Sequence, residues 1–462
     1  MIGPSERARF AWRGPMILLA ALLLAACFDS PSDHGPIASR PHDGRTFFVV
    51  AGQPAFTALV GATAHYGTYE GIHGEAAYRI EVPDAWNGVL VMYAHGYRGP
   101  VPGLTVSTPS LRGHLIASGY AWAASSYSAN YYDVRAGVED TNALALAFES
   151  LSGRAKPTKY LIMGQSMGGH ITGAVVERET LASARSAVRY AGAVPMCGVM
   201  GDNELYNYFI AYNVAAHELA GTPVESFPIT DHAAKLPAIE EALWVDYDAD
   251  RGAMTLEGEE LRHALMHLSG GPRPVFDEAF ADYQDLLLGY GGTDGTWNGI
   301  LGGNAVNTRE IDYQLDGDLE SSWSEDLFNG RVFRVGGDFL AHNRPRADGV
   351  RAMPIVWGRF DVPVVTLHTL GDLWVPVRMQ QVYAERARAN GSAAWLVQRV
   401  VRDATHCGFT LDEQIAAFEA MVRWEEDGVI PEGDDVLDPA VVADPRYGCA
   451  FTSETRPGLA AC

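Results

Sequence analysis

The fold of this chain is decided by residues 159–170, KYLIMGQSMGGH. A short apolar run leads directly into Gly-x-Ser-x-Gly, and a helical pattern follows over residues 171–179. This is the layout of a nucleophile elbow, a strained strand-to-helix turn that lifts a serine hydroxyl clear of the backbone. Gly164 and Gly168 have no Cβ to collide where the strand and the helix pass closely. The stretch predicts a nucleophilic Ser166, and the plainer interpretation is a glycine-rich turn in an ordinary α/β domain.

Strand patterns and helical patterns alternate around this stretch, and 47% of all residues are hydrophobic, which is ample for a core. The expected strands are 76–82, 88–95, 120–127, 159–166, 190–197, 362–369 and 395–401, and the expected helices are 111–118, 138–152, 169–179, 377–389 and 411–425. The alternation predicts the α/β class, with a mostly parallel sheet and helices on both faces.

The alternation breaks once, over residues 200–359, which are too many for a simple connection in a compact domain. We interpret this segment as a cap inserted into a core formed by residues 46–199 and 360–462. The cap is rich in aromatic residues, namely Tyr206, Tyr208, Phe209, Tyr212, Tyr283, Tyr290, Trp297, Tyr313 and Trp323. At helical spacing such residues favour the cap's own core over a substrate wall. Its glycine-rich segment 289–303 predicts mobile loops that admit substrate.

A serine nucleophile needs a base beside it, and the base needs an orienting carboxylate. The strand pattern that ends in Leu-Gly-Asp places Asp372 at the carboxyl end of a strand, and His406 lies on the loop after the next strand pattern. The order Ser166, Asp372, His406 is that of the α/β-hydrolase triad. Asp403 is the competing acid, but Asp372 has the better position, after a strand and a glycine.

An oxyanion hole would complete such a site. The strand pattern at 88–94 ends in His-Gly-Tyr, and in this architecture one N–H group comes from the turn after that strand and another from the residue after the nucleophile. We assign the backbone N–H groups of Tyr97 and Met167 to these roles. The side chains of His95 and Tyr97 are expected only to pack or to cap the turn. His368, in the strand before the acid, is interpreted as a core or supporting residue.

These motifs resemble those of the α/β-hydrolase superfamily, and more narrowly those of secreted bacterial serine hydrolases that carry a large cap before the acid. The resemblance covers residues 75–200 and 360–428 and leaves the cap unassigned. It implies Ser166 as the nucleophile, His406 as the base and Asp372 as the acid, with no cofactor.

The pair His406-Cys407 also looks like half of the arrangement in tannases and feruloyl esterases, in which cysteines next to the serine and the histidine form a disulfide. In this chain Gln165, not cysteine, precedes the serine. Neither activity can therefore be inferred from the pair. Cys197, on a neighbouring loop, is a candidate for the missing partner.

The N-terminus has the features of an export signal. Three arginines precede an apolar run at 16–26, and Leu-Ala-Ala-Cys at 24–27 is typical of the lipobox of bacterial lipoproteins. We expect residues 1–26 to be removed, Cys27 to carry lipid, and residues 27–45 to form a flexible tether. The chain would then be anchored in the bacterial cell envelope. An ordinary cleaved secretory signal is the alternative.

Cysteine usage agrees with export. Apart from Cys27 there are four cysteines, an even number, which suggests two disulfides with three possible pairings. We favour Cys197–Cys407, because both loops should converge on the active site, and Cys449–Cys462, because the two are close in sequence. Free buried thiols are the alternative.

The formal net charge of −23 at pH 7 argues against nucleic acid and anionic lipid headgroups as partners, since both would be repelled. The expected partner is a small ester or amide substrate, with membrane contact only through the lipid anchor. No metal site is expected. His263 and His267 resemble a metal pair, but without a third ligand they indicate a solvated helix face. The acidic run 246–257 resembles a calcium loop, but Arg251 replaces its required glycine, so an acidic connector is favoured.

The sequence therefore predicts a serine hydrolase that cleaves carboxylic esters through an acyl-enzyme. An amidase or peptidase with the same triad is the nearer alternative, because the triad does not report the leaving group. A non-catalytic binding lipoprotein on the same fold is the alternative from another class.

Overall fold

The structure is a computed structural model that describes residues 44–291, 300–318 and 320–462. The expected signal segment, Cys27 and almost all of the tether lie outside the described residues, as does Trp297. Within the described ranges, no helix is both long and apolar enough to cross a membrane.

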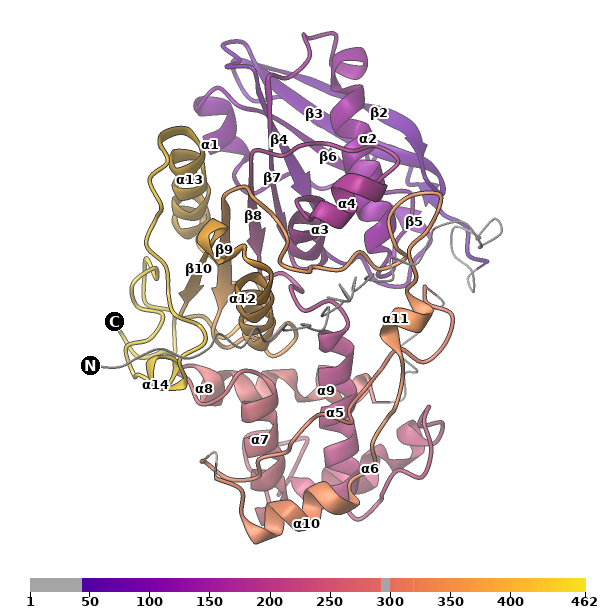
Figure 1. Cartoon of the computed structure of the whole chain (residues 1–462), viewed down its shortest axis with the longest axis vertical. Coiled ribbons are helices and arrows are strands. Elements are labelled where there is room, and N and C mark those ends of the chain that lie inside the picture. The colour runs from indigo at the N-terminus through magenta and orange to yellow at the C-terminus, as the bar shows by residue number, and fades with distance from the viewer. Residues whose placement is uncertain (1–43, 292–299, 319) are drawn as a thin grey trace, which may run out of the picture.

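An eight-stranded sheet in the order β10-β9-β8-β7-β4-β6-β3-β2 fills the upper part of the molecule in Figure 1. Its strands are β2 (Ala62–Gly71), β3 (Gly74–Pro83), β4 (Val89–Ala94), β6 (Ala121–Ser125), β7 (Lys159–Gln165), β8 (Gly192–Met196), β9 (Val364–Thr369) and β10 (Leu396–Val401). Strand β3 is antiparallel to both of its neighbours, and every other pairing is parallel. This order and this single reversed strand define the α/β-hydrolase fold, so the predicted fold class is confirmed.

Three strands were missing from the prediction. β2 is an edge strand whose residues, ATAHYGTYEG, are only partly buried and carry little apolar signal. β1 (Phe48–Val49) and β5 (Gly103–Leu104) are two residues each and pair with one another in a small parallel sheet. Short strands of this kind have no periodicity to detect.

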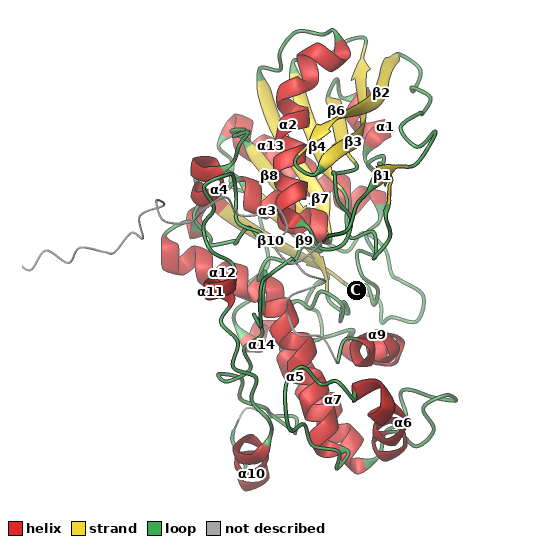
Figure 2. Ribbon diagram, turned by 90° about the vertical axis from the view of Figure 1, so that its right-hand side faces the viewer, coloured by secondary structure: helices red, strands yellow, loops and turns green. Residues whose placement is uncertain are grey.

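Helices cover both faces of the sheet (Figure 2). One apolar cluster joins the sheet to α2 (Val134–Ser152), α3 (Met167–Val175) and α12 (Arg378–Asn390), and another joins it to α1 (Arg112–Ala117) and α13 (Leu411–Asp427). Neighbours along β4 alternate between the clusters, as the two-residue period of a strand requires. The expected helix at 169–179 is two helices, because α3 ends at Val175 and α4 (Arg178–Ser183) follows.

Helices occupy the chain between β8 and β9. They are α5 (Glu204–Leu219), α6 (His232–Leu243), α7 (Leu256–Leu268), α8 (Phe276–Phe280), α9 (Gln284–Gly289), α10 (Trp323–Arg331) and α11 (Phe339–His342). Most of them form a lobe beside the sheet (Figure 1). Four aromatic residues of α5, from Tyr206 to Tyr212, are buried, as expected for a core of the lobe.

Two patterns in the lobe resemble metal sites in the sequence, the histidine pair and the acidic run, and the structure shows what each does instead. His263 and His267 face the backbone carbonyls of Leu315 and Asp316 at 3.2 Å and 3.0 Å, so the expectation of a solvated helix face is wrong: a loop packs over it. In the acidic run 246–257, carboxylates accept bonds from nearby backbone N–H groups of their own turn.

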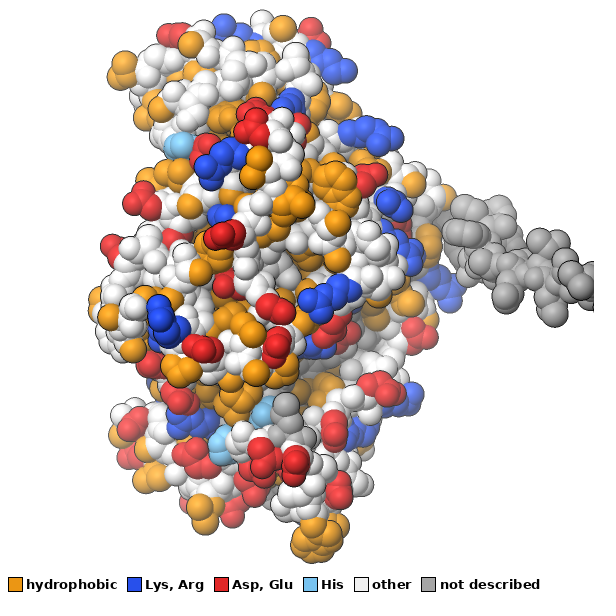
Figure 3. All heavy atoms as spheres, turned by 60° about the vertical axis from the view of Figure 1, so that its left-hand side comes forward, with side chains coloured by type: hydrophobic (Ala, Val, Ile, Leu, Met, Phe, Trp, Pro, Cys, Tyr) orange, Lys and Arg blue, Asp and Glu red, His pale blue; other side chains and the backbone are white. Residues whose placement is uncertain are grey.

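Acidic side chains are spread over the face seen in Figure 3, with lysines and arginines between them. That face carries no broad basic patch. This distribution agrees with the acidic balance of the sequence.

Candidate active site

Ser166 stands at the sharp turn between β7 and α3. Its backbone angles are φ 60° and ψ −123°, a conformation that side-chain-bearing residues rarely adopt and that functional sites tolerate. A Cβ at Gly164 would lie 2.3 Å from the carbonyl oxygen of Gly168, and one at Gly168 would lie 2.0 Å from that of Ala94. The Ser166 N–H donates to the Met196 carbonyl at 3.0 Å, which fixes the turn to β8. Both glycines are therefore obligatory for the elbow.

The side chains of Ser166, His406 and Asp372 form one hydrogen-bonded chain. His406 Nε2 lies 2.8 Å from Ser166 Oγ, and Nδ1 lies 2.5 Å from Asp372 Oδ2. Because an ionised carboxylate can only accept, Nδ1 carries the proton and Nε2 is left to accept from the serine hydroxyl. Asp372 is fully buried, and its other oxygen accepts from the N–H groups of Trp374 and Val375 at 3.0 Å and 2.9 Å. The acid is thus held at both oxygens.

His368 contacts the turn that holds Asp372. Burial is the main reason that its pKa is lowered to about 4, so the ring is neutral near pH 7. Its Nε2 donates to the Val375 carbonyl at 2.8 Å, and Gln380 donates to its Nδ1 at 3.2 Å. Val375 also donates to Asp372. His368 therefore braces the turn that holds the acid, in agreement with its expected supporting place.

Asp403 serves a different purpose. Its Oδ2 accepts from Arg456 Nε at 2.9 Å, and its Oδ1 accepts from the Thr405 N–H at 2.8 Å. Its backbone carbonyl accepts from the Gly371 N–H at 2.9 Å. Asp403 thus shapes the His406 loop and fastens it to the loop that carries the acid.

The turn after β4 lies against the serine. A Cβ at Gly96 would be 3.1 Å from Ser166 Cβ and 3.6 Å from Ser166 Oγ, so the backbone that leads into Tyr97 passes close to the hydroxyl. Met167 is the first residue of α3, where backbone N–H groups have no intrahelical partner. His95 is buried with its ring 4.1 Å from that of Tyr127, and burial, followed by the positive charge of Arg98, lowers its pKa to about 4. Its side chain packs, as expected.

A disulfide joins the serine side of the site to the histidine side. Cys197 follows Met196, whose carbonyl holds the Ser166 N–H, and it is bonded to Cys407, which follows His406. The second disulfide joins Cys449 to Cys462. Both are the pairings that the sequence favoured.

Three partly exposed aromatic side chains, Tyr97, Tyr290 and Trp374, form what we call the aromatic rim. The ring centroids of Trp374 and His406 are 5.1 Å apart, Tyr290 bonds to the side chain of Trp374, and the Tyr290 ring stacks on Phe209 with centroids 4.6 Å apart. Trp374 was not identified from the sequence as a site residue, although its position two residues after Asp372 indicates that it lies near the triad. Tyr290 was interpreted as part of the cap's own core.

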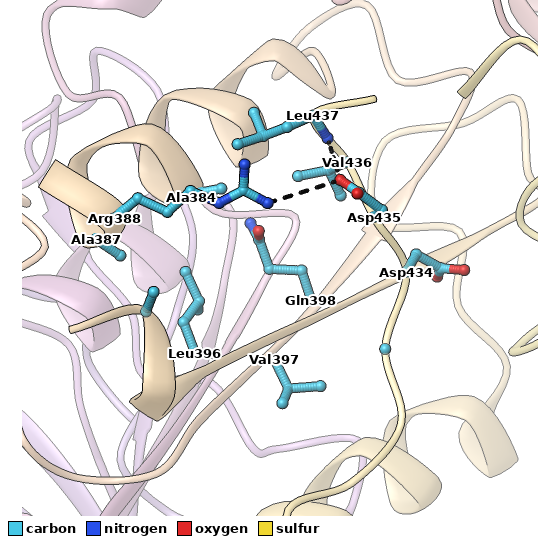
Figure 4. Close-up of a pocket in the computed structure, with 12 residues that line it drawn as sticks. Ala384, Ala387, Arg388, Leu396, Val397, Gln398, Asp434, Asp435, Val436 and Leu437 are labelled. Atoms are coloured by element: carbon cyan, nitrogen blue, oxygen red, sulfur yellow. Dashed lines mark hydrogen bonds and ion pairs between the residues drawn. The ribbon is translucent and has the colours of Figure 1, made fainter. Parts of the chain in front are cut away.

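Two hollows lie apart from the triad. One, of about 380 Å³, is lined by α12, β10 and residues 433–437, and Arg388 faces Asp435 across it at 3.9 Å (Figure 4). The other, of about 770 Å³, lies between α5, α7 and α12. Neither is lined by a triad residue.

Among the described residues, one group of three metal-ligating side chains converges, and it consists of Cys197, His406 and Cys407. The two sulfur atoms are already bonded to each other in the disulfide. The group therefore consists of the histidine of the triad and the disulfide next to it.

Comparison with known proteins gives remote similarities. No family model matches the chain. An o-phthalyl amidase from Xanthobacter agilis is 24% identical over 414 residues, which cover 78% of this chain and 88% of the amidase.

Among solved structures, feruloyl esterase B from Aspergillus oryzae has a TM-score of 0.42 and 12% identity, with 81% of this chain and 89% of that chain covered. An acylaminoacyl peptidase from Pyrococcus horikoshii has a TM-score of 0.39 and 10% identity, and the match covers 82% of this chain. The chain spans only 44% of the length of that peptidase.

Proposed function

We propose that this chain is a serine hydrolase that cleaves carboxylic esters through an acyl-enzyme intermediate. The observation that supports it most directly is the continuous hydrogen-bonded chain from Ser166 Oγ through both nitrogens of His406 to Asp372. A triad is recognised by such geometry and by the roles it permits.

In the first half of the reaction, His406 Nε2 takes the hydroxyl proton while Ser166 Oγ attacks the acyl carbon. Asp372 stabilises the imidazolium that forms. The oxyanion accepts from the N–H groups assigned to Tyr97 and Met167, and each such donor typically lowers the barrier by about 3 kcal/mol. Collapse of the tetrahedral intermediate expels the alcohol, which takes its proton from His406.

In the second half, water attacks the acyl-enzyme. His406 Nε2 accepts a proton from that water and then returns it to Ser166 Oγ as the acid leaves. The buried position of Asp372 keeps Nδ1–H as the donor through both halves.

Amide cleavage is a second candidate, because the relative that is 24% identical is an amidase. An amine leaves only when it is protonated, and His406 would supply that proton from the same nitrogen. Matched ester and amide pairs with one acyl group separate the two: a higher kcat/KM on the amide would replace the ester assignment.

Labelling with a fluorophosphonate tests the nucleophile. We expect the wild-type chain to be labelled and to hydrolyse simple esters, and Ser166→Ala to lose both properties. Ser150→Ala, an exposed serine on α2, is the matched control and should retain both. Labelling that survives Ser166→Ala would refute the proposal.

A further inference from the structure

The loop that carries the catalytic base has no regular secondary structure. His406 lies within residues 402–410, which join β10 to α13 and contain neither helix nor strand. The loop folds back on itself, because a Cβ at Gly408 would lie 2.1 Å from Asp403 Oδ1. Cys407, at the turn, has a positive φ of 59°, which residues with a side chain seldom adopt. The position of the base therefore depends on side chains that hold the loop from outside.

One arginine of the C-terminal segment contacts this loop on both sides of His406. Arg456 Nε donates to Asp403 Oδ2 at 2.9 Å, three residues before the base. Its Nη2 donates to the Gly408 carbonyl at 3.2 Å, two residues after the base, and to Glu413 Oε2 at 2.6 Å. A guanidinium presents its donors in a rigid plane. The spacing between the two sides of the loop is therefore set by one rigid group.

The charges in this cluster are largely removed from water. The exposed fraction of the side chain is 11% for Arg456, 11% for Asp403 and 1% for Glu413. Two such carboxylates without their shared cation would repel each other and would lack the solvation that water gives. Loss of the guanidinium would therefore force the loop to move or a carboxylate to take up a proton.

Both carboxylates are themselves anchored to the framework of the site. The backbone carbonyl of Asp403 accepts from the N–H of Gly371, the residue before the acid of the triad, at 2.9 Å. Glu413 lies in the first turn of α13, where it forms a capping box with Thr410. The guanidinium between them thus determines where the base lies relative to the acid loop and to α13.

Further bonds dock the C-terminal segment beside Arg456. The N–H of Ser453 donates to Glu413 Oε1 at 2.9 Å, and Thr452 Oγ1 accepts from the Arg402 N–H at 2.9 Å. These bonds join the segment directly to the base loop and to α13. We therefore expect Arg456 to keep its place in a folded variant that lacks the disulfide of this segment.

We propose that Arg456 is a positioning residue for catalysis, which keeps His406 Nε2 within hydrogen-bond reach of Ser166 Oγ; this role rests on the proposed function. The two atoms are 2.8 Å apart, and a displacement of about 1 Å costs roughly 100-fold in rate. Arg456 acts through the loop on both sides of the base, not on the substrate.

The test replaces the guanidinium and follows kcat and KM separately on one simple ester. Arg456→Met should lower kcat by about 10- to 100-fold and leave KM within about threefold of wild type, because the base is displaced while the aromatic rim is untouched. Fluorophosphonate labelling, which needs the same serine and histidine, should slow in parallel. Arg456→Lys keeps the charge but not the planar fork, so it should lose less. Glu413→Gln keeps the cap of α13 and removes one charge, so it should cause a smaller loss in the same direction.

Arg112→Met is the matched control. Arg112 donates to both carboxylate oxygens of the buried Glu81, at 2.6 Å and 2.7 Å, and to the Thr57 carbonyl, much as Arg456 bonds to its own partners. Glu81 lies in β3, which β4 and β6 separate from the strand that carries the nucleophile. This variant should lose stability in urea and keep kcat within about threefold of wild type.

Three outcomes would overturn this role: a folded Arg456→Met that keeps the wild-type kcat, a change in KM without a change in kcat, or an equal loss of kcat in the control. If circular dichroism shows that Arg456→Met does not fold, Arg456→Lys and Glu413→Gln are judged by the same criteria. All three outcomes leave the proposed function standing while the wild-type chain is labelled at Ser166. A wild-type chain that is neither labelled nor active would overturn the proposed function itself.

Discussion

Removal of the Cys197–Cys407 disulfide should lower kcat even in protein that remains folded, in addition to lowering the free energy of unfolding. The bond joins two residues that are each adjacent to a fixed part of the site. Cys197 follows the residue that holds the Ser166 N–H, and its own N–H donates to the Leu367 carbonyl of β9 at 2.8 Å. Cys407 directly follows His406 in the chain. The double variant Cys197→Ala/Cys407→Ala removes the covalent link between the His406 loop and the residue after β8 without leaving a single thiol, while the hydrogen bonds of Asp403 and Thr405 remain.

The magnitude follows from the lengths of the two closed loops. The loop between Cys197 and Cys407 spans 210 residues, and chain-entropy arguments give about 5 kcal/mol of stabilisation. The loop between Cys449 and Cys462 spans 13 residues, which gives about 3 kcal/mol. A displacement of about 1 Å between base and nucleophile costs roughly 100-fold in rate. We therefore expect kcat to fall by about 100-fold in the first double variant.

The matched control removes Cys449 and Cys462 instead. Both double variants are assayed on one ester at a temperature where circular dichroism shows each to be folded, and their unfolding is followed in urea. The control should lose stability while its kcat stays within about threefold of wild type. If the first variant is folded and keeps kcat within the same threefold range, the disulfide does not position His406 and the reasoning is wrong.

Three further outcomes follow from the site. Asp372→Asn should lower kcat by about 10⁴-fold, because the amide stabilises the wrong tautomer of the base, whereas Asp403→Asn should change kcat far less; steady-state rates on one ester separate the two acids. Gly96→Ala puts a Cβ 3.1 Å from Ser166 Cβ and should lower fluorophosphonate labelling at least tenfold in a folded protein. The buried ring of His368 has its pKa lowered from 6.5 to about 4, so the unfolded chain takes up a proton first and stability falls as pH drops from 6.5 to 4. His368→Gln should flatten that slope by about 1.4 kcal/mol per pH unit at most, as measured by urea unfolding at several pH values.

The core strands and the geometry of the triad were predictable because their signals are local. Each parallel strand is a buried apolar run, and the side chains that follow such runs meet at one edge of the sheet. The position of Asp372 directly after a strand and a glycine therefore separated it from Asp403, which is closer to His406 in sequence.

Other parts of the site have no local signal. The closeness of Gly96 to Ser166 depends on β4 and β7 being neighbours, which only the folded sheet shows. Tyr290 and Trp374 lie far apart in sequence. An aromatic residue at helical spacing gives the same sequence pattern whether it fills a core or borders a site. The strand β2 was missed for a similar reason, since an edge strand that is half exposed lacks a continuous apolar run.

The helical insert between β8 and β9 contacts the loop that carries Asp372. Arg273 of the insert is buried, and its Nε donates to the Leu370 carbonyl at 2.8 Å, two residues before the acid. Tyr208 of α5 donates to the Leu373 carbonyl at 2.9 Å, one residue after the acid. The loop that carries Asp372 is therefore held on both sides by side chains of the insert. Because the same insert supplies Tyr290 to the aromatic rim, substitutions in it should alter the orientation of the acid, and hence kcat, together with substrate choice.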